Sequence, residues 1–340
     1  MTLERHTPPT FRLATDRVGT DLDHDRAAGV VLGAAVGDAL GAPFEFAPRG
    51  TFSARLPERR DDGVGDMIGG GAFGWEPGEF TDDTQMGLAL ATSLLDRGGY
   101  DPDDLWRRWQ AWAETSLDVG NTTRFALAHP DWRDVEHPDP DRTAANGALM
   151  RAFPLALATL DADVTMARAV TLHQSLLTHA HPAAAWGAWL GVAMMRAGVA
   201  GEDPLAELES ELVLLAQLDR MTAQRFIVML DPAWRPEDGD LAHIGNGSVW
   251  GCLAQAVWAL RRHDRFADVL AEVVELGKDT DTVACVAGAV AGAREGASAI
   301  PTGWLEPVHG TVDTPHGLEH YEQRDLMELA LRLSPGAASD

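Results

Sequence analysis

Apolar residues recur with helical spacing along most of the chain after residue 24. Many of these periodic segments start at Asp, Thr, Asn or Pro and several end just before Gly, which is typical of helices. No long run alternates apolar and polar residues with a period of two, so no strand is predicted. Helices are expected at residues 81–97, 101–117, 144–159, 163–178, 182–198, 204–217, 246–262, 265–276, 281–295 and 322–333. The pattern predicts an all-α protein, a single-domain orthogonal bundle of many helices.

The segment that begins at Asp25 is expected to form a buried central helix. It carries Gly29, Gly33, Gly37 and Gly41 at every fourth position, which places all four on one helical face. An interior Gly costs a helix about 1 kcal/mol relative to Ala. Four of them on one face therefore indicate that another backbone packs there at close range.

Two stretches lack helical periodicity and divide the chain. Residues 1–24 are polar and contain Pro8 and Pro9, so we predict a flexible N-terminal arm followed by one helical domain over residues 25–335. Residues 61–79 are Gly-rich and predict a loop beside a functional site. Trp75 lies in this loop and could cover the site as part of a lid.

The charge balance narrows the classes of partner. The chain has 52 acidic and 27 basic residues, a formal net charge of −25, which disfavours a nucleic acid duplex or an anionic membrane as a partner. Neither a targeting segment nor an uninterrupted apolar run of membrane-spanning length is apparent, so a cytoplasmic protein is expected. The two cysteines, Cys252 and Cys285, lie in apolar stretches where reduced, buried thiols are the ordinary state.

Two acidic clusters fall at expected helix starts. One is Thr81-Asp82-Asp83-Thr84, and the other runs from Asp279 through Thr282. Asp and Thr at a helix start are ordinary caps, and each cluster alone is compatible with that role. Together the carboxylates and hydroxyls form an oxygen-only ligand set, which suits magnesium, manganese or calcium rather than zinc.

Six sequence motifs carry a resemblance to a known family. In chain order they are GDALGAPFEF (37–46), PGEFTDDT (77–84), NGALMR (146–151), LTHAHP (177–182), GNGSVWGCLAQAVWA (245–259) and KDTDTVACVAGAVAGA (278–293). Over about residues 25–310 the chain resembles the ADP-ribosylglycohydrolases, including the dinitrogenase-reductase-activating glycohydrolases. The pairing of TDDT with DTDT, with the other motifs between them, makes the resemblance specific.

The resemblance implies a binuclear metal site in a central cleft. Two Mg²⁺ ions are expected, with Mn²⁺ as the alternative, and Asp281 is placed to bridge them. Glu45 matches a glutamate at the site, and either Asp82 or Glu45 is expected to act as the acid or base. The implied metal ligands are Thr81, Asp82, Asp83, Asp279, Asp281 and Thr282.

The resemblance also implies substrate contacts, each with a structural alternative. Asn146 and Gly147 match a loop near the phosphates or ribose, although Asn146 could be a helix cap. His179 matches a substrate-side histidine, although it could be a hydrogen-bonded core residue. Gly245 and Gly247 match the loop beside the adenosine, where glycine permits close approach of a ligand.

Two positions depart from the family pattern. Lys278, the chain's single lysine, stands where relatives commonly have Gly; it could pair with a substrate phosphate, repel cations, or simply reach solvent. Ser248 stands where an aromatic residue is frequent and expected to stack on the nucleotide. Trp250 is a candidate replacement for that aromatic face.

The expected function is metal-dependent hydrolysis that removes ADP-ribose from a modified acceptor, with arginine on a protein as the leading case. Water would attack the anomeric carbon of the ribose. Serine, guanidine-like molecules and O-acetyl-ADP-ribose remain alternative acceptors. A different class of function is an immunity or regulatory protein that binds and blocks an ADP-ribosyltransferase, and a third is a structural relative without turnover, which the complete acidic clusters disfavour.

Overall fold

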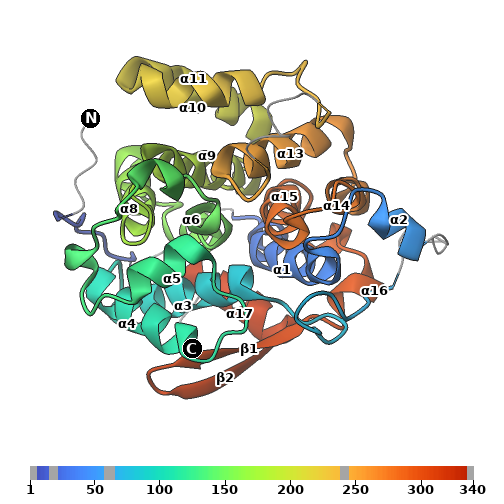
Figure 1. The fold of residues 1–340 in the computed structure, drawn as a ribbon, viewed down its shortest axis with the longest axis horizontal. Coiled ribbons are helices and arrows are strands. Elements are labelled where there is room, and N and C mark those ends of the chain that lie inside the picture. The colour runs from blue at the N-terminus through green and yellow to red at the C-terminus, as the bar shows by residue number, and fades with distance from the viewer. Residues whose placement is uncertain (1–5, 15–21, 57–65, 238–244, 335–340) are drawn as a thin grey trace.

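The computed structural model describes residues 6–14, 22–56, 66–237 and 245–334, and most of their regular structure is helical (Figure 1). The all-α prediction is thereby confirmed, apart from one short hairpin. The first half of the chain forms α1 (His24–Gly41), η1 (Ala42–Phe44), α2 (Thr51–Arg55), α3 (Asp82–Arg97), α4 (Pro102–Ala113), α5 (Asn121–Leu127), η2 (Trp132–Asp134), η3 (Pro140–Thr143), α6 (Gly147–Met150) and α7 (Phe153–Ala158). The second half forms α8 (Val164–Leu176), α9 (Pro182–Val199), α10 (Pro204–Leu218), α11 (Arg220–Met229), α13 (Val249–Arg262), α14 (Phe266–Glu275), α15 (Thr280–Glu295), η4 (Ala297–Ala299), α16 (Thr302–Leu305), β1 (His309–Thr314), β2 (Gly317–Glu322) and α17 (Gln323–Leu333).

Helix α1 lies at the centre of the molecule against α15, as the glycine pattern predicts. A Cβ built on Gly33 would lie 2.2 Å from the carbonyl oxygen of Gly288, and one built on Gly288 would lie 2.1 Å from that of Gly33. Gly29 and Gly292 meet in the same reciprocal way, at 2.1 and 1.9 Å. Side chains at these positions would push the helices apart, so the contact depends on glycine in both helices.

The same contact continues to the functional end of α1. A Cβ on Gly37 would lie 2.0 Å from the carbonyl oxygen of Ala284, and one on Gly41 would lie 2.5 Å from the backbone nitrogen of Asp281. The hydroxyl of Thr280 donates a hydrogen bond to the carbonyl of Gly41, at 2.9 Å. The start of α15, with its acidic cluster, therefore rests on the end of α1.

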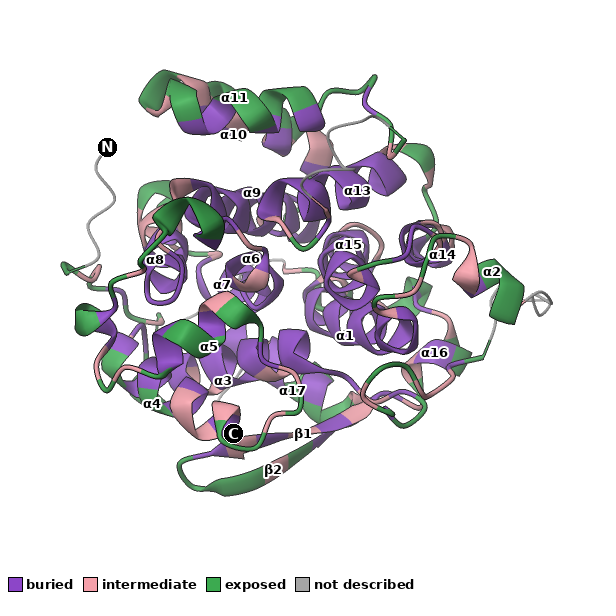
Figure 2. Cartoon of the chain, in the orientation of Figure 1, coloured by how far each residue is buried: buried purple, intermediate pink, exposed green. Residues whose placement is uncertain are grey.

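Burial decreases outward from this central pair. Helices α1, α9 and α15 are buried almost along their whole length, whereas α10 and α11 form an outer layer with an exposed face (Figure 2). The segment His24–Phe44 is long and apolar enough to cross a membrane by length and composition alone, but its apolar 18-residue window is buried inside the protein. Such enclosure is the ordinary position of a core helix.

Several expected elements differ in detail from the observed ones. The segment 144–159 is two short helices, α6 and α7, rather than one, and Pro154 lies in the first turn of α7. Helix α4 ends at Ala113 rather than 117. Helices α5 and α11 were not predicted.

The prediction that no strand forms is wrong for residues 309–322. Strands β1 and β2 pair antiparallel, from His309 opposite Glu322 to Thr314 opposite Gly317. Burial alternates along β1, but the run is only six residues long and carries a single large apolar residue, Val312. The hairpin contacts the segment just before α3. The backbone nitrogen of Phe80 donates a hydrogen bond to the carbonyl of His309 at 3.0 Å.

The described part of the N-terminal arm lies against the domain. Phe11 is buried, and its carbonyl accepts a hydrogen bond from the backbone nitrogen of Tyr100 at 3.1 Å. Leu13 donates its backbone N–H to Gly98 at 3.0 Å. The predicted arm is therefore attached near the end of α3 through residues 11–13, while 1–5 and 15–21 lie outside the described residues.

Substitution of Gly33 by Ala tests the central contact. In an unconstrained helix this change stabilises by up to about 1 kcal/mol, but here the added methyl meets a backbone carbonyl of α15. We expect the free energy of unfolding to fall by about 1–3 kcal/mol, measured by chemical denaturation. The matched control is Gly303→Ala in α16, where no atom lies within 4 Å of the new Cβ. Equal effects of the two substitutions would contradict the account.

Candidate active site

The first turn of α3 is held by a buried aspartate from α1. The Asp38 carboxylate accepts hydrogen bonds from the backbone nitrogens of Thr81 and Thr84, both at 3.0 Å, and from their hydroxyls at 2.7 and 2.6 Å. Burial raises the pKa of Asp38 to about 6, and the four hydrogen bonds oppose that rise. Asp38 thus satisfies helix-start donors that a local cap would otherwise serve.

This arrangement leaves the acidic side chains after Thr81 available for another role. Thr81 occupies the N-cap position of α3 without a side-chain capping hydrogen bond. Asp279 occupies the N-cap of α15, and its side chain accepts from Asn146 instead of capping the helix. The capping interpretation of these two positions is therefore wrong, and Asp38, which the sequence reasoning did not single out, caps α3.

Five carboxylates converge between α1, α3 and α15. Ligand atoms of Asp82, Asp83 and Asp281 lie within 4.8 Å of one another, and so do those of Glu45, Asp118 and Asp281. Asp281 belongs to both groups, the position expected of a bridging ligand. Asp118, from the loop before α5, was not predicted.

Burial and mutual repulsion make this cluster costly without a cation. Burial first, and then neighbouring carboxylates, raise the pKa of Asp82, Asp83 and Asp281 well above the usual range. The same causes raise the pKa of Glu45 to about 8. One buried oxygen each of Glu45 and Asp83 finds no hydrogen-bond donor among the described residues.

The donor set fits hard divalent cations. Every group is an oxygen ligand, and three of the carboxylates, Asp82, Asp83 and Asp281, lie in the first turns of α3 and α15. Unpaired buried carboxylate oxygens gain most from a positive charge. The Thr282 hydroxyl lies 3.4 Å from Asp83 Oδ2, so the two predicted ligand groups meet at one place.

Two asparagines fix the loop that carries Asp279. The side-chain nitrogen of Asn146 donates to Asp279 Oδ2 at 2.8 Å and to the carbonyl of Asn246 at 3.0 Å. Asn246 in turn accepts from the backbone nitrogen of Asp279 at 3.2 Å and donates to the carbonyl of Gly277 at 3.0 Å. Asn146 therefore positions a predicted ligand, a role more specific than a helix cap.

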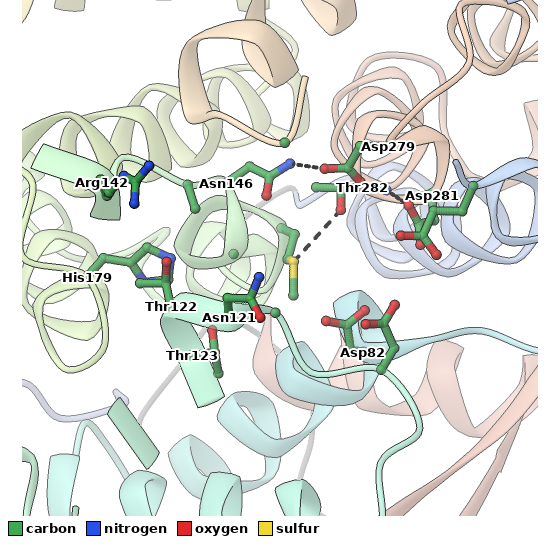
Figure 3. A pocket seen from close by; sticks show the side chains of 17 residues that line it. Asp82, Asn121, Thr122, Thr123, Arg142, Asn146, His179, Asp279, Asp281 and Thr282 are labelled. Carbon is green, nitrogen blue, oxygen red and sulfur yellow. Dashed lines mark hydrogen bonds between the residues drawn. The ribbon is translucent and has the colours of Figure 1, made fainter. Parts of the chain in front are cut away.

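A cavity of about 350 Å³ opens over the acidic cluster (Figure 3). The predicted site residues that line it are Glu45, Asp82, Asn146, Gly147, His179, Gly247, Asp279, Asp281 and Thr282. Its unpredicted lining includes Asp118, Gly120–Thr123 and Arg142. Asp82, Asp279 and Asp281 lie at one side of the close-up, and Arg142 and His179 lie at the other.

Other predicted positions lie beside or beneath this cavity. Thr81 and Asp83 are fully buried and do not line it. Gly245 does not line the cavity; its backbone has φ +70°, and its carbonyl accepts from the Ser248 hydroxyl at 2.8 Å. Gly247 lines the cavity, and a Cβ there would lie 3.3 Å from Asp279 Oδ2.

Neither tryptophan suggested as a ligand contact lines the cavity. Trp75 is buried, and its ring packs against Phe73 with a centroid distance of 5.7 Å, so the lid hypothesis has no support. Trp250 faces a separate hollow of about 680 Å³ together with His181 and Arg225. Ser248 caps α13 by accepting from Gly251 at 3.1 Å.

Lys278 has a left-handed backbone conformation that favours glycine. Lys278 and Phe46 are the non-glycine residues with positive φ among those described, at +70° and +63°. Two backbone hydrogen bonds join the segments around these residues. The N–H of Phe46 donates to the carbonyl of Lys278 at 2.7 Å, and the N–H of Lys278 donates to the carbonyl of Ala47 at 2.8 Å. This strained pairing joins the segment after Glu45 to the segment before Asp279.

His179 is buried at the opposite side of the cavity from the acids. Its Nδ1 lies 2.8 Å from the Thr178 hydroxyl, and its Nε2 has no partner among the described residues. Burial, followed by the charge of Arg151, lowers the pKa of His179 well below its usual value. The imidazole is therefore neutral at pH 7, with one nitrogen facing the cavity.

Comparison with known proteins identifies the family. The profile of the ADP-ribosylglycohydrolase family matches residues 19–339. The ADP-ribosyl-[dinitrogen reductase] glycohydrolase of Rhodospirillum rubrum is 33% identical over 294 residues, covering 85% of this chain and 92% of that protein. The ADP-ribosylarginine hydrolase Tri1 of Pseudomonas putida is 32% identical over 298 residues, covering 84% of this chain and 74% of that one.

One solved structure is similar to this chain in both sequence and fold. The one titled "ADP-ribosylglycohydrolase-related protein complex" aligns with a TM-score of 0.71 and 33% identity, covering 93% of this chain and 99% of that chain. The chain belongs to the ADP-ribosylglycohydrolase family.

The residues that sequence reasoning missed had weak local signals. Asp38 is a single charged residue inside an otherwise apolar helix, a pattern that indicates a buried, partnered carboxylate. Asp118 precedes Gly120 and a run of Asn and Thr, which resembles an ordinary turn. Arg142 lies in a polar loop without periodicity, where the sequence gives no indication of its neighbours.

Replacing Asp38 with Asn should disrupt the start of α3. The amide offers one acceptor oxygen, and its NH₂ group would face the N–H and O–H donors of Thr81 and Thr84. We expect a loss of about 2–4 kcal/mol in the free energy of unfolding, measured by denaturation. Asp101→Asn is the matched control, because Asp101 is a partly exposed cap of α4 and Asn caps equally well. A Asp38→Asn protein as stable as this control would contradict the assigned role.

The raised carboxyl pKa values predict how stability depends on pH. Glu45 binds its proton more tightly in the folded chain, with a pKa of about 8 against 4.5. The folded state therefore holds the extra proton between these values, and stability without divalent cation falls as pH rises through that window. Added Mg²⁺ should raise the melting temperature more at pH 8 than at pH 6, relative to chelator. A Mg²⁺ effect that is equal or larger at pH 6 would contradict the assignment.

Proposed function

We propose that the protein is a metal-dependent hydrolase that releases ADP-ribose from a modified acceptor, with arginine on a protein as the expected acceptor and two Mg²⁺ ions, or Mn²⁺, as cofactors. The observation that carries this proposal is the polarity of the cavity. Five carboxylates gather at one end, and a neutral histidine backed by a buried arginine lies at the other. An ADP-ribose unit has matching ends, because its distal ribose carries hydroxyls and its diphosphate carries negative charge.

The acidic end is suited to hold divalent cations between Asp82, Asp83, Asp281, Glu45 and Asp118. When bound, such ions would supply Lewis-acid stabilisation and lower the pKa of a nearby water. Asn146 fixes the orientation of the Asp279 carboxylate in this end of the cavity through a 2.8 Å hydrogen bond.

Glu45 is the better candidate than Asp82 for proton transfer. Both residues line the cavity, but Glu45 is only partly buried, whereas Asp82 is 7% exposed and lies in the tight group with Asp83 and Asp281. Without cations, burial and the neighbouring carboxylates raise the pKa of Glu45 to about 8, so its proton is held more firmly than that of an ordinary glutamate. In this role Glu45 takes the proton of the attacking water or protonates the leaving acceptor, while the ribose passes through an oxocarbenium-like transition state.

Two features support arginine as the acceptor. The similar proteins from Rhodospirillum rubrum and Pseudomonas putida are named for the removal of ADP-ribose, and the second is named for arginine. The acidic residues Glu45 and Asp118, both partly exposed, lie where a guanidinium leaving group would be attracted. A cytoplasmic, ADP-ribosylated protein is the proposed partner, and no membrane or nucleic acid is invoked.

The experiment is release of free ADP-ribose from an ADP-ribosyl-arginine protein, with Mg²⁺ and with chelator. Glu45→Gln should lower kcat by about 10²–10³ even at saturating Mg²⁺, and it should also raise the Mg²⁺ concentration needed, because Glu45 belongs to the acidic group that would hold a cation. Asp82→Asn should abolish the Mg²⁺ response itself. Glu76→Gln, an exposed carboxylate in the loop before α3, is the control and should leave kcat unchanged.

Other outcomes would redirect the assignment. Release from serine or small-molecule conjugates but not from arginine would change the acceptor and keep the chemistry. Absence of release from every conjugate would contradict the hydrolase. If the protein then blocked an ADP-ribosyltransferase, and did so equally with Asp82→Asn, the inhibitory function would replace it.

A further inference from the structure

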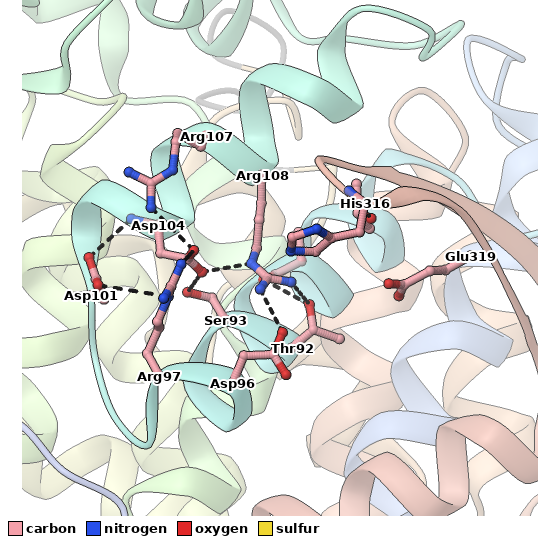
Figure 4. Close-up of polar contacts among 12 residues, drawn as sticks. Thr92, Ser93, Asp96, Arg97, Asp101, Asp104, Arg107, Arg108, His316 and Glu319 are labelled. Atoms are coloured by element: carbon pink, nitrogen blue, oxygen red, sulfur yellow. Dashed lines mark hydrogen bonds and ion pairs between the residues drawn. The ribbon is translucent and has the colours of Figure 1, made fainter.

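Two arginines are buried among the described residues, and only one has carboxylate partners. Arg108 on α4 pairs with Asp104 at 2.7 Å and with Asp96 at 2.6 Å (Figure 4). Burial lowers the pKa of Arg108, but these two carboxylates outweigh it and raise the pKa overall. This is the ordinary way to keep a guanidinium inside a protein.

Arg151 is held differently, by neutral groups alone. It is fully buried; its Nε donates to Gln174 Oε1 at 3.0 Å, and its guanidinium lies 3.9 Å from the centre of the Trp109 ring. Its terminal nitrogen donates to the Gln174 carbonyl at 3.1 Å and to the Thr178 hydroxyl at 2.7 Å. Burial lowers the pKa of Arg151 to about 9, so the charge is still present at neutral pH.

The positive charge of Arg151 is connected to the cavity by two hydrogen bonds. The guanidinium has no acceptor, so it donates to the Thr178 oxygen. The hydrogen of that hydroxyl has one acceptor within reach among the described residues, Nδ1 of His179 at 2.8 Å. A neutral imidazole whose Nδ1 accepts carries its own hydrogen on Nε2.

Nε2 of His179 is the atom that faces the cavity. It is buried without a partner among the described residues, and a Cβ built on the cavity residue Gly147 would lie 3.4 Å from it. The side chain as a whole is 1% exposed. An unmet N–H in such a place gains by donating to a ligand oxygen.

Resting on the function proposed above, we propose that Arg151 and Thr178 are positioning residues that fix His179 as the Nε2–H tautomer, so that it donates to a phosphate oxygen of the bound ADP-ribose. The relay is cooperative, because the charged guanidinium of Arg151 polarises the Thr178 hydroxyl, and that hydroxyl in turn polarises the imidazole of His179. An anionic acceptor gains most from that arrangement, and the diphosphate is the anionic part of the substrate. His179 consequently acts as a hydrogen-bond donor and neither as a general base nor as a metal ligand.

The tautomer can be tested in the free protein, independently of catalysis. A long-range ¹H–¹⁵N spectrum should show the Nδ1 of His179 as an unprotonated nitrogen and its Nε2 as a protonated one, assigned with His179→Gln. Thr178→Ser should keep this pattern, and Thr178→Val, which fills the same space without a hydroxyl, should lose it. A protonated Nδ1 in the wild type would overturn the relay.

The phosphate contact is tested with ADP-ribose itself. Loss of a hydrogen bond to a charged group predicts that Thr178→Val weakens ADP-ribose binding about 10- to 100-fold by calorimetry, with rescue by Thr178→Ser. In the hydrolysis assay the loss should appear in KM more than in kcat. A shift in one ³¹P resonance of bound ADP-ribose between wild type and Thr178→Val would place the contact on the diphosphate.

Failures of the two proposals are distinguishable. Wild-type protein that binds no ADP-ribose would overturn the proposed function and the phosphate contact together, while the nitrogen spectrum would still decide the tautomer. Equal ADP-ribose affinity of Thr178→Val and wild type, or unchanged ³¹P resonances, would overturn this inference and leave the hydrolase intact. Circular dichroism establishes that each variant is folded before either comparison.

Discussion

The close approach of α1 and α15 is the constraint on which the site depends. Glycines on both helices bring the two backbones into contact, and no larger residue fits at Gly33 or Gly288. The contact ends at Gly41, directly beneath Asp281. From one turn earlier in α1, Asp38 reaches the start of α3 and holds Thr81 and Thr84. One helix thereby sets the relative positions of both acidic clusters, and a shift of α1 would separate them.

Charge separation is the second organising feature. The acidic cluster is too crowded to be fully ionised without a cation, as the raised pKa values of Asp82, Asp83 and Asp281 indicate. Next to His179 at the other end of the cavity, the buried guanidinium of Arg151 has no carboxylate partner among the described residues. A bound substrate with hydroxyls at one end and a diphosphate at the other would, together with cations, compensate both costs. The unfavourable free energy of burying these charges without a ligand is therefore consistent with a binding role.

Much of the fold could be predicted from the sequence. The periodicity of apolar residues determines each helix locally, and glycines at every fourth position indicate close packing against one neighbouring helix. The two acidic clusters could be predicted to meet only through the family resemblance. Asp38, Asp118 and Arg142 could not, since their roles come from packing between segments distant in sequence. The φ of +70° at Lys278, a conformation that favours glycine, could not be read from a lysine in the sequence. The β1–β2 hairpin was missed because its alternation is short and polar.

The central claim is that the carboxylates around Asp281 form one site for two divalent cations. The most direct measurement is electron paramagnetic resonance of the protein titrated with Mn²⁺, which substitutes for Mg²⁺ at oxygen ligands. The account predicts that the signal of a second equivalent of Mn²⁺ couples magnetically to the first, and that Asp281→Asn abolishes the coupling. Only isolated, uncoupled Mn²⁺, or no binding at stoichiometric concentration, would contradict it.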